Sequence, residues 1–92
     1  MKVVWTDFAS ENLDEIFEFY AKRSPTLGQK IVSRLVLKAD FLGNFPLMGR
    51  MVIKKNNPAF REIFDQTYRI VYYVRENRID ILTVTQSTKE FE

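Results

Sequence analysis

The chain has 92 residues, of which 46% are apolar, and a net charge of +2, which together predict one folded domain over residues 1–92. It contains no cysteine and no histidine, which excludes disulfides, thiolate nucleophiles and the commonest general base and metal ligand, so we expect no metal and no other cofactor. The absence of a long apolar segment predicts a cytoplasmic protein that is neither secreted nor inserted in a membrane.

The first predicted elements are a strand and an amphipathic helix. Lys2–Trp5 is short, apolar and rich in β-prone residues, which predicts a strand. Thr6 or Asp7 then supplies an N-cap for a helix whose outer face is acidic. The apolar positions that recur at helical spacing are Ala9, Leu13, Ile16, Phe17 and Tyr20.

A second amphipathic helix follows almost directly. Ser24 as N-cap and Pro25 at the first helical position mark its start, and Gly43 is expected to end it. Because the link between the two helices is short, they should pack as an antiparallel hairpin. Beside the apolar stripe of the second helix runs a basic row at positions i, i+4 and i+8, formed by Lys30, Arg34 and Lys38.

Charge is distributed unevenly along the chain. Residues 1–21 carry a net charge of −4, residues 22–61 carry +8, and residues 62–92 carry −2. The basic middle segment suits a nucleic acid or an acidic partner protein, and a solvated helix face accounts for it about as well.

The second half of the chain predicts a loop and three strands. Residues 44–58 are interrupted by proline and glycine and form a loop, in which Val52 and Ile53 are expected to add a brief strand. Residues 61–66, 68–74 and 79–85 predict an antiparallel meander, with Glu76-Asn77 as the turn between the last two strands. The fold class is therefore α+β, with the two-helix hairpin packed on one face of a mainly antiparallel sheet.

Residue alternation assigns side chains to the two faces of this sheet. Tyr68, Ile70, Tyr72 and Val74 should share one face, and Arg69, Val71, Tyr73 and Arg75 the other. In the last strand, Ile79 and Ile81 should share a face with Thr83 and Thr85. Two helices cover only one face, so the other should keep a partly apolar surface edged by Arg61, Arg69 and Arg75, which is typical of a contact site.

The order of these elements resembles the RelE/ParE superfamily of bacterial toxin–antitoxin toxins over nearly the whole chain. The loop motif followed by Arg-Glu-Ile and Tyr-Arg-Ile-Val-Tyr is most similar to the ParE side. The residues that carry the resemblance are Val4-Trp5, Leu42-x-x-Phe45-Pro46-x-x-Gly49-Arg50, Arg61-Glu62-Ile63, Tyr68-Arg69-Ile70-Val71-Tyr72 and Ile79-x-Ile81-Leu82-x-Val84.

The resemblance implies a toxin with one of two activities. Members similar to RelE or YoeB cut messenger RNA on the ribosome, using cations on the sheet to hold phosphate and a Tyr, His or Glu for proton transfer. Members similar to ParE poison DNA gyrase. Both kinds are neutralised by a cognate antitoxin. The complex of toxin and antitoxin represses its own operon, and it binds operator DNA only through the antitoxin. Such systems serve plasmid stabilisation.

Carried over by position, the resemblance favours the gyrase branch. Arg69 and Arg61 stand where RelE-like enzymes have a phosphate-holding arginine and a lysine, whereas Gln86-Ser87-Thr88 stands where a functional Arg or a His-Tyr pair follows the last strand. The sequence therefore contains cations that could stabilise charge in a ribonuclease reaction, but not the residues that would transfer protons. If the chain is nonetheless an mRNA endonuclease, its site residues are Arg61, Arg69, Lys54 and Lys55.

Several of these residues have a structural interpretation as well. Arg69 could hold a phosphate or an acidic antitoxin side chain, or pair with Glu62, Asp65 or Asp80 on neighbouring strands. The tyrosines of the meander could stack on bases but more often belong to a core. Lys54 and Lys55 suit a nucleic-acid backbone and equally a solvated loop.

We therefore predict a ParE-like toxin that inhibits DNA gyrase, with an mRNA endonuclease as the alternative and a non-toxic nucleic-acid-binding module as a weaker one. The residues predicted to bind the antitoxin or the target are Arg61, Arg69, Tyr73, Arg75, Lys30, Arg34 and Lys38.

Overall fold

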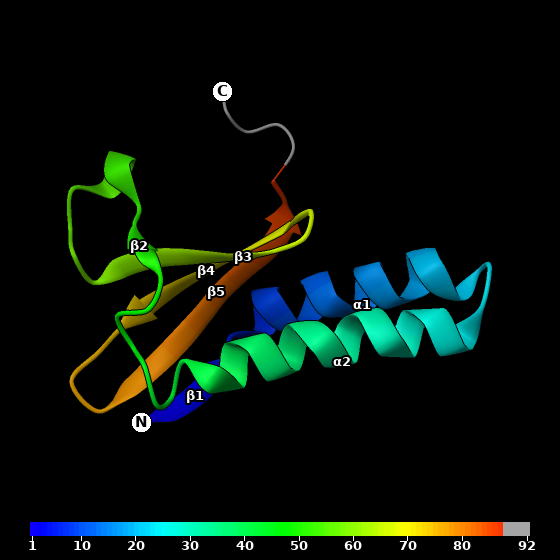
Figure 1. Ribbon diagram of the computed structural model, residues 1–92, viewed down its shortest axis with the longest axis horizontal. Coiled ribbons are helices and arrows are strands. Elements are labelled where there is room, and N and C mark those ends of the chain that lie inside the picture. The colour runs from blue at the N-terminus through cyan, green and yellow to red at the C-terminus, as the bar shows by residue number, and fades with distance from the viewer. Residues whose placement is uncertain (88–92) are drawn as a thin grey trace.

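Five strands form one sheet in the order β1-β5-β4-β3-β2, and a pair of helices lies along one of its faces (Figure 1). The computed structural model describes residues 1–87. In chain order the elements are β1 (Lys2–Trp5), α1 (Asp7–Ala21), α2 (Pro25–Phe41), β2 (Arg50–Met51), the short 3-10 helix η1 (Ile53–Lys55), β3 (Phe60–Asp65), β4 (Tyr68–Val74) and β5 (Arg78–Gln86). β1 pairs with β5 in parallel and the other neighbours are antiparallel, which confirms the predicted fold class.

Both helices begin where their capping residues predict. The Thr6 hydroxyl accepts a hydrogen bond from the backbone N–H of Ala9 at 3.1 Å, and the Ser24 hydroxyl accepts one from Leu27 at 3.2 Å. Thr6 also donates to the carbonyl of Ile81 at 2.8 Å, so the cap of α1 fixes the helix to β5. No helix within residues 1–87 is both long enough and apolar enough to cross a membrane.

The end of α2 differs in mechanism from the prediction. The helix ends at Phe41, close to Gly43, but no glycine in residues 1–87 has a positive φ, so Gly43 does not end the helix through a left-handed conformation. A Cβ atom on Gly43 would lie 2.6 Å from the carbonyl oxygen of Met1. Glycine is therefore needed for the close approach of the N-terminus, whose ammonium donates to the Gly43 carbonyl at 2.7 Å.

The short strand predicted at Val52 and Ile53 lies two residues earlier. Arg50 is opposite Glu62 and Met51 is opposite Arg61 in the ladder between β2 and β3. Ile53 instead begins η1. The difference arises because the pairing depends on the register with β3, which the local apolar pattern does not reveal.

The core lies between the helices and the sheet. Its fully buried large side chains come from both layers and are Leu35, Leu42, Ile70, Tyr72, Ile79 and Ile81. The predicted alternation in β4 holds for Tyr68, Ile70 and Tyr72, which all belong to this core. The opposite face of β4 therefore points away from the helices.

The predicted alternation in β5 is wrong after Ile81 because the strand contains a bulge. Tyr72 is opposite Ile81 but Val71 is opposite Thr83, so Leu82 is an extra residue. The shift places Val84, which is 2% exposed, in the core instead of Thr83. Beyond the end of β1 the free edge of β5 is covered by α1, where Asn12 Oδ1 accepts from the Val84 N–H at 2.9 Å and from the Thr83 hydroxyl at 2.8 Å.

Candidate functional site

The face of the sheet that the helices leave uncovered carries two buried carboxylates, each between two arginines. We call it the open face, and the strand register places on it Phe60, Glu62, Phe64, Arg69, Val71, Tyr73 and Asp80. Glu62 is 7% exposed and Asp80 is 6% exposed. Carboxylates so little exposed need cationic partners, because an unpaired buried charge is strongly unfavourable.

Glu62 is held by arginines from two neighbouring strands. Arg69 Nε lies 2.6 Å from Glu62 Oε1, and Arg50 Nε lies 2.8 Å from Glu62 Oε2. Burial would raise the pKa of the Glu62 carboxyl, but the hydrogen bonds from Arg69 and Arg50 outweigh it and hold that pKa below its ordinary value. Of the partners predicted for Arg69, the structure selects Glu62. Arg50 also lies over the Phe64 ring, 5.0 Å from its centroid.

Asp80 is held in the same way at the other end of the open face. Arg75 Nε lies 2.6 Å from Asp80 Oδ2, and Arg78 Nε lies 2.8 Å from Asp80 Oδ1. The hydrogen bonds from Arg78 and Arg75 lower the pKa of Asp80. Arg75 also stacks on the Tyr73 ring at 4.7 Å from its centroid, and Tyr73 makes an edge contact with Phe60. The predicted site residues Arg69, Tyr73 and Arg75 thus share this face.

Arg61 does not lie on the open face, and the prediction that it edges this surface with Arg69 is wrong. In the register Arg61 is opposite Tyr72, a core residue, whereas Arg69 is opposite Phe64. The reason is that consecutive side chains in a strand point to opposite faces of the sheet, so Arg61 and its neighbour Glu62 lie on different faces. Arg61 Nη1 donates to the Gly49 carbonyl at 2.8 Å and its Nε donates to the Pro58 carbonyl at 2.9 Å.

Arg61 and Tyr72 together fix the loop that joins α2 to β2. The Tyr72 hydroxyl accepts from the Gly49 N–H at 2.9 Å and donates to the Pro46 carbonyl at 2.8 Å. Burial raises the pKa of Tyr72 against the opposing effects of the Gly49 N–H and Arg61, so the phenol stays protonated and can donate. A Cβ atom on Gly49 would lie 2.6 Å from the Glu62 carbonyl oxygen, so glycine is needed for this approach.

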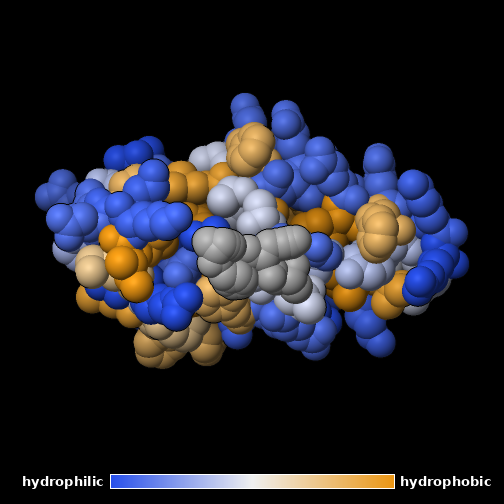
Figure 2. Space-filling view, turned by 90° about the horizontal axis from the view of Figure 1, so that it is seen from above, coloured by the Kyte–Doolittle hydropathy of each residue, from blue (hydrophilic) through white to orange (hydrophobic). Residues whose placement is uncertain are grey.

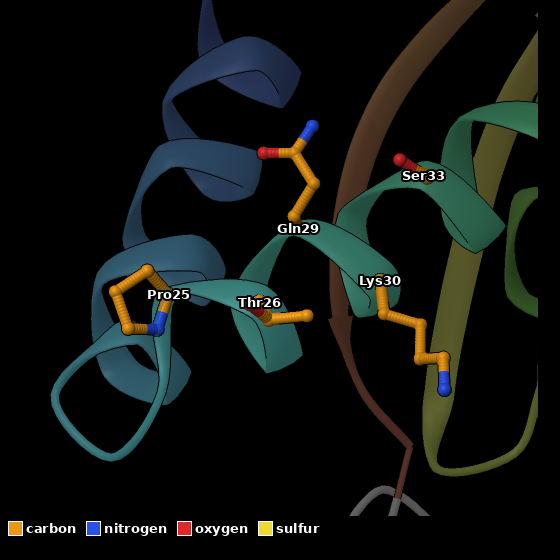
Figure 3. A pocket seen from close by; sticks show the side chains of 5 residues that line it. All are labelled: Pro25, Thr26, Gln29, Lys30 and Ser33. Atoms are coloured by element: carbon orange, nitrogen blue, oxygen red, sulfur yellow. The ribbon is translucent and has the colours of Figure 1, made fainter.

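The remaining predicted cations lie in η1 and in α2, and one of them, Lys55, contacts the edge of the open face at Phe60. Lys54 and Lys55 belong to η1, and Lys55 Nζ lies 5.1 Å from the centroid of the Phe60 ring. The basic row of α2 is on the helix layer, where Arg34 Nε pairs with Asp65 Oδ2 at 2.7 Å. Lys30 borders an open depression on the outer side of α2, whose lining residues Pro25, Thr26, Gln29, Lys30 and Ser33 all come from the first half of that helix (Figure 3). Of the four ribonuclease candidates, Arg61 and Arg69 therefore lie on opposite faces of the sheet, and Lys55 lies beside Phe60.

Sequence reasoning missed Arg50 and Arg78 as members of the open face. Arg78 could have been found, because it precedes Asp80 by two residues in a strand and so shares its face. Arg50 had no such signal, because its pairing with Glu62 depends on the position of β2. The aspartate between Ile79 and Ile81 was itself a sign of a buried ion pair.

The chemistry of the open face suits acidic groups better than proton transfer. Four arginines surround two carboxylates there, which leaves a local excess of positive charge. Both carboxylates have lowered pKa values, so neither is matched to a general acid or base working near neutral pH. Residues 1–87 contain no group of three acidic, histidine or cysteine side chains placed to hold a metal ion. Thr88, named in the comparison with RelE-like enzymes, lies outside the described residues.

Comparisons with known proteins agree with this architecture. The family model described as the ParE toxin of the type II toxin–antitoxin system parDE matches residues 3–91. The protein named Toxin RelE2 from Caulobacter vibrioides (strain ATCC 19089 / CIP 103742 / CB 15) is 29% identical over 89 residues, which cover 96% of this chain and 97% of that protein. A solved chain of the chromosomal ParDE toxin–antitoxin system from P. aeruginosa has a TM-score of 0.79 at 22% identity, covering 94% of this chain and 95% of that one, and supports the fold.

Proposed function

The chain belongs to the ParE family of type II toxin–antitoxin toxins, and on that premise we propose that it inhibits DNA gyrase and is neutralised by a cognate antitoxin. The family implies the antitoxin partner, and the choice of gyrase as the target is the proposal. In this scheme operator DNA is bound only through the antitoxin, and the toxin itself acts by binding rather than by cleaving a substrate.

The observation that carries the proposal is the separation of Arg61 from Arg69. Arg69 stands where ribonucleases of this superfamily have a phosphate-holding arginine and Arg61 where they have a lysine, and here the two lie on opposite faces of the sheet. Arg69 is held by Glu62 at 2.6 Å, and Arg61 donates to two backbone carbonyls. A single phosphate group cannot contact both guanidinium groups in this arrangement.

A second observation supports the same choice. Messenger RNA cleavage at neutral pH needs a group that takes up a proton and one that gives it back. The carboxylates of the open face have pKa values held below their ordinary range, and the Tyr72 hydroxyl, whose pKa is raised, is buried under the loop after α2. Glu62, Asp80 and Tyr72 therefore do not supply a matched acid and base, whereas the arginines of the open face could stabilise charge.

The second candidate function is a ribosome-dependent mRNA endonuclease. The observation that favours it is the name of the relative, Toxin RelE2, which matches nearly the full length of this chain. Arg61, Arg69, Lys54 and Lys55 would be its site residues. A non-toxic module that binds nucleic acid is the weaker third candidate.

Expression in bacterial cells separates these functions. The topology of a reporter plasmid and the 5′ ends of transcripts are measured from the same culture, for the wild type, for Arg69→Ala and for the matched control Arg23→Ala. Arg23 lies in the link between α1 and α2 and is exposed, so its removal tests for a general effect of lost charge.

Gyrase inhibition predicts growth arrest with loss of negative supercoiling and unchanged transcript ends. New transcript ends within codons, absent in Arg69→Ala and present in Arg23→Ala, would instead establish the endonuclease. Normal growth, together with binding of the purified chain to bare nucleic acid that falls steeply with salt, would establish the third candidate.

A further inference from the structure

An exposed apolar surface covers the C-terminal end of α2 and the loop that follows. We call it the α2 patch, and its residues are Leu37, Phe41, Phe45, Leu47 and Met48, whose exposed fractions run from 44% to 68%. Leu37 and Phe41 are one helical turn apart, and the rings of Phe41 and Phe45 lie 5.3 Å apart between centroids. A contiguous group of large apolar side chains is unfavourable in water and marks a contact surface.

The patch leads along the chain into further exposed apolar residues. The loop after α2 ends at β2, where Met51 is 39% exposed, and Ile53 in η1 is 80% exposed. Figure 2 shows hydrophobic surface gathered at the end of the molecule where Figure 1 places β2 and η1. Exposed apolar residues therefore continue along the chain from the α2 patch to β2 and η1.

The net charge beside the patch is positive, because Lys30 and Lys38 outnumber the exposed Asp40, which lies three residues after Leu37. Lys30 and Lys38 lie on α2 with Leu37 and Phe41, and within residues 1–87 neither lysine forms an ion pair. Lys30 is separated from Leu37 by two helical turns, which places both on one side of the helix. A partner that covers the patch gains most if carboxylates flank its own apolar residues.

The other exposed helix surface has the opposite charge. α1 exposes Phe8 and Phe19, which are 60% and 65% exposed. The exposed charged residues of this helix are all acidic, and the exposed Lys22 and Arg23 follow its end; the acids are Asp7, Glu11, Asp14, Glu15 and Glu18. An acidic partner would be repelled around Phe8, where Asp7 and Glu11 are its charged neighbours, so charge distinguishes this part of α1 from the α2 patch.

The loop part of the patch is held rigid. Tyr72 binds both Gly49 and Pro46, and Arg61 binds the Gly49 carbonyl. Phe45, Leu47 and Met48 thus belong to a segment fixed to the sheet, and a rigid surface loses little conformational entropy when it binds. Arg61 and Tyr72 are positioning residues for this surface.

We propose that the α2 patch anchors the antitoxin through an amphipathic segment that carries apolar side chains flanked by carboxylates. The proposal rests on membership of the toxin family, and it assigns the antitoxin a surface separate from the open face. Arg61, predicted as a binding residue, contributes by holding the loop.

The test is calorimetric titration of the full chain with the purified antitoxin encoded in the same operon. Leu37→Ser and Phe41→Ser should each weaken binding by roughly 10- to 100-fold, the loss that follows truncation of a central interface side chain. The matched control is Phe8→Ser, which removes an equally exposed phenylalanine from α1 and should leave the affinity unchanged. Circular dichroism verifies that each variant is folded, as expected for residues more than half exposed.

A double variant tests the contribution of the positive charge. Lys30→Glu/Lys38→Glu should weaken binding and reduce its dependence on salt, because two attractive contacts are lost. Wild-type affinity in Leu37→Ser and Phe41→Ser would overturn the proposal, and so would an equal loss in Phe8→Ser.

Gyrase inhibition without the antitoxin is measured on the same variants. Retained inhibition in Leu37→Ser and Phe41→Ser, no longer relieved by the antitoxin, supports the proposal. Inhibition lost with antitoxin affinity unchanged would overturn it and assign the patch to the target. If the wild type itself fails to inhibit gyrase, the proposed function is wrong. The affinities of the variants for the antitoxin still test whether the α2 patch binds it.

Discussion

At the scale of single residues, Glu62 is a buried carboxylate that links two strands of the open face. It is almost fully buried, and it joins β2 to β4 through the side chains of Arg50 and Arg69. Without it, two arginines of like charge would lie side by side without a counter-ion. The carboxylate is therefore both a structural link and the group that keeps Arg69 in place.

Glu62→Gln should lower the free energy of unfolding at pH 7 by about 1–3 kcal/mol, because an amide accepts weaker hydrogen bonds from arginine than a carboxylate. The folded-state pKa of Glu62 lies below its ordinary value of 4.5. Its contribution is thus present above that value and is lost as the pH falls through the folded-state pKa. Urea unfolding of both proteins from pH 7 to pH 3 should show the difference shrinking at the acid end.

The control for this measurement is Glu76→Gln, in the exposed turn between β4 and β5. It should unfold like the wild type at every pH. A difference between wild type and Glu62→Gln that stays constant down to pH 3 would contradict the assigned role of the carboxylate.

Tyr72 is the second residue with a predicted effect, this time on the loop. Tyr72→Phe removes the bonds to Gly49 and Pro46 while keeping the buried ring. We expect a loss of about 1–3 kcal/mol of unfolding free energy, since two backbone groups lose their partner. Faster amide hydrogen exchange at Gly49, with unchanged exchange in α1, would localise the loss. Unchanged exchange at Gly49 would show that the hydroxyl does not fix the loop.

At the scale of elements, the free edge of β5 is protected by a side chain of α1. Asn12→Ala should expose the Val84 N–H and cost about 1 kcal/mol, and the exchange of that amide should accelerate. Asn77→Ala, in an exposed turn, is the matched control. If the Val84 amide exchanges equally slowly in both variants, another group protects this edge.

Local patterns in the sequence predicted most of the elements. The caps at Thr6 and Ser24 and the alternation of β4 were readable because each depends on neighbouring residues only. The bulge at Leu82 and the position of β2 were not, because both depend on pairing with a distant strand.

The candidate site was predictable in the same limited way. Arg69, Tyr73 and Arg75 were placed on one face by their spacing within a single strand. The sequence-based prediction groups Arg61 with Arg69 and Arg75 at the edge of the uncovered face. Its position two residues before the buried Ile63 instead places it on the side of the sheet that the helices cover. The alternation of side chains along a strand therefore predicts the face on which a residue lies better than its similarity to a family residue does.

At the scale of the whole molecule, the two faces of the sheet separate two surfaces. The open face presents arginines bound to buried carboxylates, and the helix layer presents the α2 patch with its lysines. The basic middle segment of the sequence thus contributes to both surfaces, through Arg50 on one and Lys30 and Lys38 on the other. If the α2 patch binds the antitoxin as proposed, the open face stays available for a different partner.

The most direct measurement of the proposed activity is a supercoiling assay in which the full chain is added to purified gyrase and relaxed plasmid. A translation reaction with ribosomes and labelled messenger RNA is run in parallel. We predict that supercoiling is blocked, that the antitoxin restores it, and that the message stays intact. Unimpaired supercoiling at a molar excess of the chain, with message cut within codons, would contradict the account.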